Sequence, residues 1–396
     1  MTTTERSVPH WAVVLGGLLS LAAAMGIGRF AFTPLLPLMA RDGQLGLSAG
    51  GWLAAANYVG YFVGALTAAR LPGKATRLAG VALLLTAATT AAMAWPGMAW
   101  WLLLRFAAGV ASAWVFVATS VWCLGALARD GRQAQAGWVY AGVGTGIALT
   151  GLVCWIAGAA GVAARDLWVG LGVLALALMV PVVGVLLRMP QAGVATPAYG
   201  EAGRADAEMR GLVVCYGLMG FGYILPATFL PALARSVVDD PRLFGLAWPL
   251  FGATAAASTV LSAWIVRHAS RLQVWAVSQA LMGVGALLPS LWLNGATIAL
   301  SALLVGGTFM VITLAGVQEM RARAPQQAAR RVGQVTAAFA FGQIAGPVLS
   351  ALLLQWPALH ERGLALALQA GALALLASSA WLARRAFFVS KEIVHA

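Results

Sequence analysis

The chain alternates long apolar runs with short polar breaks over most of its length. Each run is about 20 residues or longer, the length an α-helix needs to cross the hydrocarbon core of a membrane. The pattern predicts an all-α membrane protein with twelve transmembrane helices in two sets of six. The expected helices cover residues 11–39, 49–69, 77–95, 100–127, 138–160, 167–187, 211–234, 243–266, 272–293, 296–318, 332–355 and 362–382.

The composition places the chain in lipid. It is 61% hydrophobic and 9% charged, with a mean hydropathy of +0.86, whereas soluble domains carry about 25% charged residues. The first apolar run exceeds the ~7–15-residue core of a signal peptide and lacks a small-residue cleavage site, so we expect a retained helix. Cys123, Cys154 and Cys215 lie inside apolar runs, and we expect them to be buried and unpaired.

One segment occurs twice. Residues 25–41 read MGIGRFAFTPLLPLMAR and residues 219–235 read MGFGYILPATFLPALAR, an offset of 194 residues. Two similar halves in a membrane protein are typical of transporters that work around a central site. We expect six-helix bundles at residues 1–189 and 210–396, with a cytoplasmic linker over 190–209, where Gly, Ala and charged residues gather.

The basic residues orient the helices. Of the 25 Lys and Arg, we assign 18 to the side of the N-terminus and the linker, and two lie inside helices. The positive-inside rule makes that side cytoplasmic, so we expect both termini in the cytoplasm and the protein in a bacterial inner membrane. The net charge of +13 then reflects contact with lipid headgroups and not with nucleic acid. The five basic residues on the other side are Arg41, Arg165, Arg235, Arg242 and Arg362.

Arg29 and Arg105 are the two arginines inside expected helices. A charge at the membrane centre costs at least about 2.5–3.5 kcal/mol on insertion scales. No Asp or Glu lies inside an expected helix, so a cavity that receives a carboxylate or phosphate would suit both guanidinium groups. For Arg105 the alternatives are bonds to carbonyls of a broken helix or extension to the outer surface, and Arg29 could also be structural.

Tyr223 occupies the place of Arg29 in the second copy of the repeat, and we expect it opposite Arg29 as a ligand contact. Hydrogen bonding between helices is the alternative for the other polar residues of the apolar runs. Among these, Asn57, Tyr140 and Tyr216 complete our predicted substrate-binding set. Tyr58, Tyr61, Gln279 and Gln343 are the remaining candidates.

Prolines and glycines predict moving parts. Pro34 and Pro37, mirrored by Pro226 and Pro231, lie late in the first and seventh expected helices and should kink or loosen their outer ends during gating. The pair Gly142 and Gly146 should let the fifth helix approach its neighbours closely and slide.

These positions resemble the major facilitator superfamily over essentially the whole chain. Arg105 and Gly109 fit its helix 4 pattern, and the Gly-Ile-Gly-Arg-Phe-Ala-Phe-Thr-Pro-Leu-Leu-Pro segment resembles its YbfB/YjiJ-like branch. The resemblance implies two six-helix bundles, a cavity lined by helices 1, 4, 7 and 10, and transport. It also implies a gate in the loop after helix 2. That loop keeps Gly64, Arg70, Gly73 and Lys74 of the superfamily motif, with Ala68 where an acid is usual.

We therefore expect a secondary transporter that moves a small organic solute, an anion, by alternating access. The glycine row of the fifth helix leaves an alternative, broad efflux of drugs or metabolites driven by protons. Glu319 is the one carboxylate near a cavity-lining helix that could carry the proton, and it also fits a plain ion pair beside Arg321 and Arg323.

Other classes have less support. The chain has no phosphate-binding loop of the G-x-x-x-x-G-K-[ST] type, and its four histidines are dispersed. We expect neither an enzyme nor a cofactor or metal site, and keep a membrane-embedded enzyme or a non-transporting receptor as remote alternatives. The expected partners are a small-molecule substrate, membrane lipid and, for efflux, protons, with the protein as a monomer.

Overall fold

The computed structural model describes residues 8–45, 47–68, 70–71, 74–189, 204–235, 237, 245–265, 268–356 and 362–394. Every element within these ranges is a helix. The first helix is built from three consecutive pieces, and short 3₁₀ turns precede two of the others. The first half holds α1 (His10–Leu21), the π-helix η1 (Ala22–Arg29), α2 (Phe32–Arg41), α3 (Leu47–Ala68), α4 (Ala75–Ala92), α5 (Met98–Arg129), η2 (Gln133–Gln135), α6 (Ala136–Ala159) and α7 (Ala164–Leu186). The second half holds α8 (Arg204–Arg235), α10 (Ala247–Ile265), α11 (Arg271–Leu291), α12 (Gly295–Arg323), η3 (Pro325–Gln327), α13 (Ala328–Gln355) and α14 (Gly363–Val394).

The expected helix count is confirmed in the described residues. Taking α1, η1 and α2 as one interrupted helix, each half holds six helices. Ten of the twelve are long and apolar enough to cross a membrane by length and composition, and α3 and α10 complete the two sets. The break near residue 294 is sharp because Asn294 and Thr297 form a reciprocal capping box at the start of α12.

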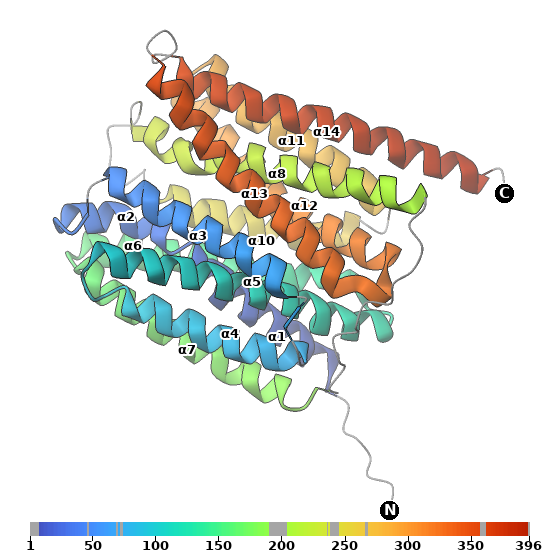
Figure 1. Cartoon of the computed structure of the whole chain (residues 1–396), viewed down its shortest axis with the longest axis horizontal. Coiled ribbons are helices and arrows are strands. Elements are labelled where there is room, and N and C mark those ends of the chain that lie inside the picture. The colour runs from blue at the N-terminus through green and yellow to red at the C-terminus, as the bar shows by residue number, and fades with distance from the viewer. Residues whose placement is uncertain are drawn as a thin grey trace, which may run out of the picture.

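The two halves form two bundles that lie against each other along their length (Figure 1). In the first, α5 packs between α3 and α4, and α6 packs on α1; in the second, α11 packs on α12 and α14, and α13 packs on α8. The bundles meet where α6 contacts α10 and where α3 contacts α13. The start of α1 and the end of α14 lie at the same end of the molecule (Figure 1).

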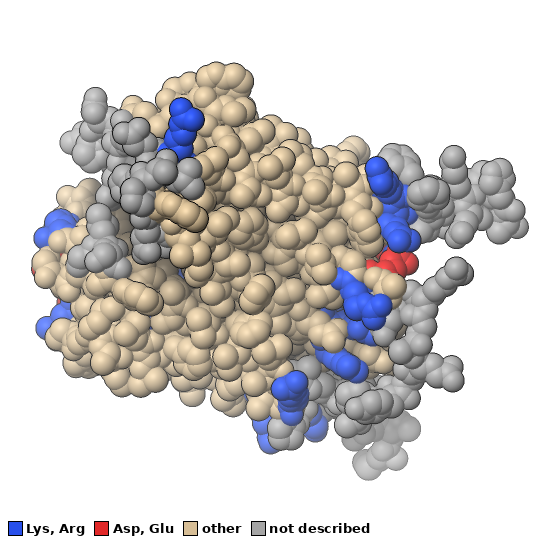
Figure 2. Space-filling view, turned by 45° about the horizontal axis from the view of Figure 1, so that its top comes forward, with Lys and Arg blue, Asp and Glu red and all other residues tan. Residues whose placement is uncertain are grey.

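The surface divides into a wide apolar belt and two charged ends. Figure 2 shows Lys and Arg at the ends of the bundle, with other residues over the space between them. Large apolar side chains such as Val180, Leu303 and Leu373 are exposed on this belt, as expected of surface that faces lipid. We call the end that carries Arg129, Arg271 and Arg323 the basic end.

The seventh helix begins before the predicted residue and is continuous where helix 1 is interrupted. It begins at Arg204 within the range assigned to the linker, because the segment from Arg204 to Arg210 is rich in good helix formers; residues 190–203 lie outside the described part. It also runs as one helix from Arg204 to Arg235 through Pro226 and Pro231, whereas helix 1 is interrupted. The prolines of the two copies therefore have different consequences.

The glycine row of α6 brings three helices into backbone contact. A methyl group at Gly146 would lie 2.5 Å from the Ala22 carbonyl oxygen and 2.8 Å from the Cα atom of Gly26. Gly142 faces the Leu18 carbonyl in the same way, and Gly144 faces Gly252 of α10. The row thus packs α6 tightly against helix 1 on one side and against the other bundle on the other.

This packing predicts a position-specific effect of added methyl groups. Gly146→Ala should lower the unfolding temperature of the detergent-solubilised protein by several degrees, because overpacking a tight contact costs about 1–3 kcal/mol. Gly170→Ala in α7 is the matched control, since its methyl group would meet nothing within 4 Å. Equal unfolding temperatures for the two variants would contradict the tight α6 contact.

Candidate functional site

Helix 1 is interrupted in its membrane-spanning part. Residues Ala22–Arg29 form a π-helix, in which Phe30 N donates to the Met25 carbonyl at 3.0 Å, and a turn at Phe30 and Ala31 precedes α2. Pro34 has no N–H group, and its ring crowds the carbonyl four residues earlier, that of Phe30. The proline therefore accounts for a break at this point, and the break places Arg29 at the end of a rigid turn.

Arg29 is enclosed between the two bundles. Its side chain is 2% exposed, and its Nη2 donates a hydrogen bond to Oε1 of Gln343 on α13. Its Cζ lies 3.6 Å from the ring centroid of Tyr61 on α3. Rings and an amide oxygen therefore stabilise this charge where a carboxylate would be expected. Three further rings, those of Phe30, Phe339 and Tyr58, have centroids 5.4, 5.9 and 6.0 Å from Cζ.

Several polar groups around Arg29 have no partner. Nε and Nη1 of Arg29, Nε2 of Gln343 and the hydroxyl of Tyr223 are buried without a hydrogen bond. None of the described ion pairs includes Arg29 or Arg105. An unpaired buried polar group costs about 1–3 kcal/mol. A cluster of unused donors at a bundle interface is therefore what a binding site for a hydrogen-bond acceptor would have.

The second bundle supplies an aromatic wall. Tyr223 of α8 stacks on Phe309 of α12 with centroids 5.0 Å apart, and Phe309 stacks on Phe251 of α10 at 5.4 Å. Phe251 in turn stacks on Trp248 at 5.3 Å. Tyr223 also lies 6.0 Å from Phe339, the ring that flanks Arg29. The repeat-related pair, Arg29 and Tyr223, thus lies around one ring of α13.

Arg105 has a different environment. Its Nη1 and Nη2 donate to the carbonyl oxygens of Gly28 and Arg29 at 3.4 and 3.2 Å, and its Cζ lies 4.8 Å from the Phe32 ring centroid. These carbonyls lie at the end of the π-helix, where regular helical bonding stops. The geometry favours the carbonyl-binding alternative for Arg105, which holds the interrupted turn in place, although its Nε remains without a partner.

The other predicted substrate-binding residues are distributed differently. Asn57 donates to the Arg105 carbonyl at 3.0 Å and so connects α3 to α5 at the position of Arg105. Tyr216 packs its ring on Phe339 at 5.9 Å, beside the site. Tyr140 does not join this group: its hydroxyl lies 2.7 Å from Ser120 Oγ, next to a contact at the basic end. Gln279 accepts from Trp275 and donates to Cys215, as expected for a bond between helices.

Two polar contacts join the bundles at the basic end. Arg321 of α12 donates to the Ser120 carbonyl of α5 at 2.6 Å. Gln318, one turn earlier, donates to the Gln133 carbonyl of η2 at 3.4 Å. The first contact joins α12 to α5 and the second joins α12 to η2, so at the basic end side chains of one bundle bond to carbonyls of the other.

The predicted gating residues occupy several settings. Gly64 packs α3 on α5, where a methyl group would lie 2.6 Å from the Val110 carbonyl. Arg70 and Lys74 are exposed at the basic end, and Gly73 lies outside the described residues. Pro34 and Pro37 are half-buried in α2.

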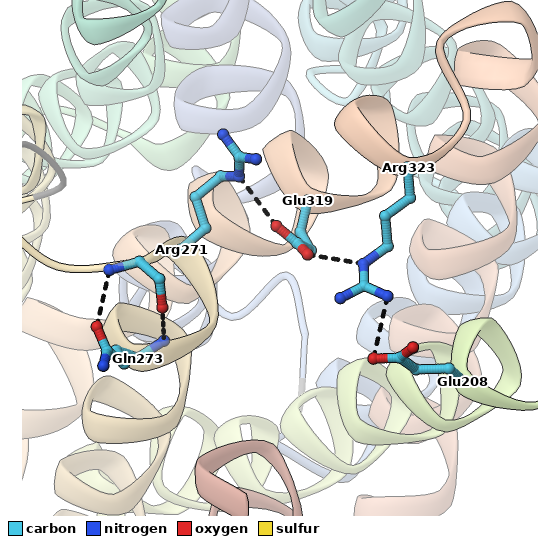
Figure 3. Close-up of polar contacts among 6 residues, drawn as sticks. Glu208, Arg271, Gln273, Glu319 and Arg323 are labelled. Carbon is cyan, nitrogen blue, oxygen red and sulfur yellow. Dashed lines mark hydrogen bonds and ion pairs between the residues drawn. The ribbon is translucent and has the colours of Figure 1, made fainter. Parts of the chain in front are cut away.

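Glu319 takes part in a chain of ion pairs at the basic end (Figure 3). Its two oxygens accept from Arg271 Nε at 2.9 Å and Arg323 Nε at 2.7 Å, and Arg323 continues to Glu208 at 3.0 Å. The chain links α8, α11 and α12 of one bundle. With both oxygens occupied, Glu319 matches the ion-pair alternative better than a proton carrier in the path.

Some site residues carried no clear signal in the sequence. Phe339 and Gln343 are four residues apart on α13 and therefore share a helix face that points at Arg29. Gln343 was a candidate for bonding between helices, and that bond is present, but its partner could not be named. The Ser120 carbonyl and Phe309 had no sequence signal at all, because one is backbone and the other is one apolar residue among many.

Comparisons with known proteins find a family and solved structures that this chain resembles. The family profile described as "Uncharacterised MFS-type transporter YbfB" matches residues 21–382. No curated protein matches the sequence significantly. Among solved structures, the human organic anion transporter MFSD10 aligns with a TM-score of 0.72 at 15% identity, over 96% of this chain and 100% of that one. A double-tryptophan mutant of XylE aligns with a TM-score of 0.72 at 11% identity, over 94% of each chain.

The ion-pair chain predicts a role in stability for Glu319. Glu319→Gln should lower the unfolding temperature, because two arginines lose a charged partner in a position where only 10% of the carboxylate side chain is exposed. Thermal denaturation in detergent checks this. Glu208→Gln is the control and should lower it less, because Glu208 holds one arginine and its side chain is 28% exposed. A Glu319 variant that unfolds like the wild type would contradict the structural role.

Proposed function

This chain belongs to the YbfB-type family of the major facilitator superfamily, and we propose that it moves a small organic anion across the bacterial inner membrane by alternating access. The family and the fold make it a membrane transporter and not an enzyme. The negative charge that we propose for the solute is supported by the residues of the site.

Arg29 is the observation that carries the proposal. It lies buried at the bundle interface, two of its guanidinium nitrogens are unpaired, and no described ion pair reaches it. A guanidinium group binds carboxylate in a bidentate manner and strengthens that bond when water is excluded. An anion that enters between the bundles satisfies these nitrogens and balances the buried charge.

Relatives of the same fold are compatible with this substrate class. One structural neighbour is described as an organic anion transporter. At 15% identity the likeness supports only the fold, so the comparison indicates that this architecture accommodates such solutes. The choice of anion for this chain rests on Arg29.

Alternating access requires the bundles to close and open at each end in turn. In our proposal the basic end faces the cytoplasm, as the positive-inside rule indicates. The Arg321 and Gln318 contacts then close the cytoplasmic side, and they separate when the site opens inward. Arg105 acts as a positioning residue that keeps the turn bearing Arg29 fixed during this movement. The protein works as a monomer.

Proton-driven efflux receives less support from the site. That alternative began from the α6 glycine row and from Glu319. The glycines are accounted for by close packing on helix 1 and α10, and both oxygens of Glu319 are held by arginines of its own bundle. We therefore propose anion transport without a proton carrier at Glu319.

The proposal predicts that anion binding depends on Arg29. In a thermal-shift screen of the purified protein against anionic, neutral and cationic solutes, an anion should raise the unfolding temperature of the wild type, because a ligand that binds the folded state stabilises it. The shift should disappear in Arg29→Gln. Arg188→Gln, which changes an exposed arginine after α7, is the matched control and should respond like the wild type.

A different outcome would remove the proposal. If neutral solutes or lipophilic cations stabilise the wild type and Arg29→Gln equally, and no anion needs Arg29, then the arginine is structural. If an anion does stabilise the protein through Arg29, its uptake into proteoliposomes, measured with the same three proteins, decides whether the bound solute is also transported.

A further inference from the structure

Resting on the proposed function, we propose that the substrate is an aromatic monocarboxylate and that its carboxylate takes the place on Arg29 now held by the amide oxygen of Gln343. Gln343 is then a specificity-determining residue: it occupies the anion position when the carrier is empty.

Gln343 presents a neutral counterpart of a carboxylate. Its Oε1 accepts from Arg29 Nη2, as one carboxylate oxygen would. Nε and Nη1 of Arg29 stay unpaired because an amide has one carbonyl oxygen where a carboxylate has two acceptors. The amide nitrogen of Gln343 is also unpaired, and Gln343 is fully buried. An anion would satisfy the guanidinium fork better than the residue now present.

The walls of the site select against strongly hydrated anions. The centroids of four aromatic rings lie within 6.0 Å of Arg29 Cζ, and the nearest of them, that of Tyr61, is 3.6 Å away. Transfer of an anion into such surroundings requires removal of its water, and the cost rises steeply with charge density. Arg105 offers no equivalent second fork, because both its terminal nitrogens donate to backbone carbonyls. A single carboxylate on an apolar body fits these conditions, whereas a dicarboxylate or phosphate does not.

The apolar body has the edges of aromatic rings to pack against. Tyr223, Phe309, Phe251 and Trp248 form a continuous series of stacked rings, with interplanar angles of 22°, 20° and 4° between neighbours. The series begins beside Phe339, the ring shared by Arg29 and Tyr223. Because neighbouring rings cover each other's faces, the series presents ring edges, on which an aromatic substrate packs edge to face. Such a pair adds about 0.5–1.5 kcal/mol to simple burial, so an aromatic ring next to the carboxylate gains more here than an aliphatic chain.

The exchange also connects binding to bundle movement. Arg29 belongs to the first bundle and Gln343 to the second, so their hydrogen bond crosses the interface. When the carboxylate displaces Gln343, the direct link is replaced by one that runs through the substrate and the aromatic wall. The empty carrier closes on Gln343 and the loaded carrier closes on substrate, which gives both forms a partner for the buried charge.

Three probes of similar size test the substrate class: benzoate, its neutral analogue benzamide, and the dicarboxylate succinate. Benzoate at millimolar concentration should raise the unfolding temperature of the wild type and of Arg188→Gln. Benzamide and succinate should have much smaller effects. In Arg29→Gln the dissociation constant for benzoate, measured by calorimetry, should rise at least about tenfold, the loss of one charged hydrogen bond.

These probes separate failure of the inference from failure of the proposed function. If succinate stabilises the protein through Arg29 and benzoate does not, the site binds an organic anion but the aromatic monocarboxylate is wrong. If benzamide raises the unfolding temperature as much as benzoate does, Arg29 does not recognise the carboxylate. If no anion gives an Arg29-dependent shift, the organic anion transporter itself is wrong.

Two variants of Gln343 test the exchange. Gln343→Glu places a carboxylate on Arg29 permanently, so this protein should unfold at a higher temperature without ligand and should lose its response to benzoate. Gln343→Leu removes the competing oxygen and should bind benzoate at least as tightly as the wild type, because no protein contact has to be displaced. The Leu variant decides the matter if the Glu variant does not fold. Wild-type benzoate affinity in Gln343→Glu, or loss of binding in Gln343→Leu, would overturn the exchange.

Discussion

A guanidinium group buried inside a membrane protein without a carboxylate is the constraint around which this structure is arranged. Removing such a charge from water costs several kcal/mol even after relaxation. Arg29 recovers part of this through the Tyr61 ring at 3.6 Å and the amide oxygen of Gln343. Both partners are neutral, so a net positive charge remains at the bundle interface. That surplus is the physical basis of the anion that we propose as the solute.

The local shape of helix 1 follows from the need to hold this charge at a fixed place. Pro34 interrupts regular bonding near Phe30, and Arg105 satisfies the carbonyls at the end of the π-helix. Gly26 permits this irregular turn to lie directly against Gly146 of α6, where any larger residue would collide with backbone. Proline, arginine and glycine thus have separate roles in one feature: the first breaks the helix, the second holds the break, and the third makes room for it.

The sequence was sufficient for the helices and for part of the site. Runs of about 20 apolar residues report the membrane directly, and the internal repeat pairs Arg29 with Tyr223, two residues that both lie near Phe339. It was not sufficient for the partners of Arg29, because a π-helix and the facing positions of α3 and α13 depend on how two bundles dock. The mirrored prolines show the same limit. Helix 1 is interrupted by a turn at Phe30 and Ala31, just before Pro34, whereas α8 stays helical through Pro226 in a different packing environment.

The kinds of contact within and between the bundles fit a carrier that must open repeatedly. The ion pairs described above, from Glu208 through Arg323 and Glu319 to Arg271, join helices of a single bundle. The contacts between bundles pair an arginine or glutamine with a neutral oxygen: Arg29 with Gln343, Arg321 with Ser120, and Gln318 with Gln133. None of the described ion pairs therefore has to break when the bundles separate, whereas each hydrogen bond to one charged group that is lost contributes about 1.5–3 kcal/mol. The ion pairs of Glu319 hold α8, α11 and α12 of the second bundle together. The hydrogen bonds across the interface end on neutral oxygens and can be exchanged for solvent or substrate in every cycle.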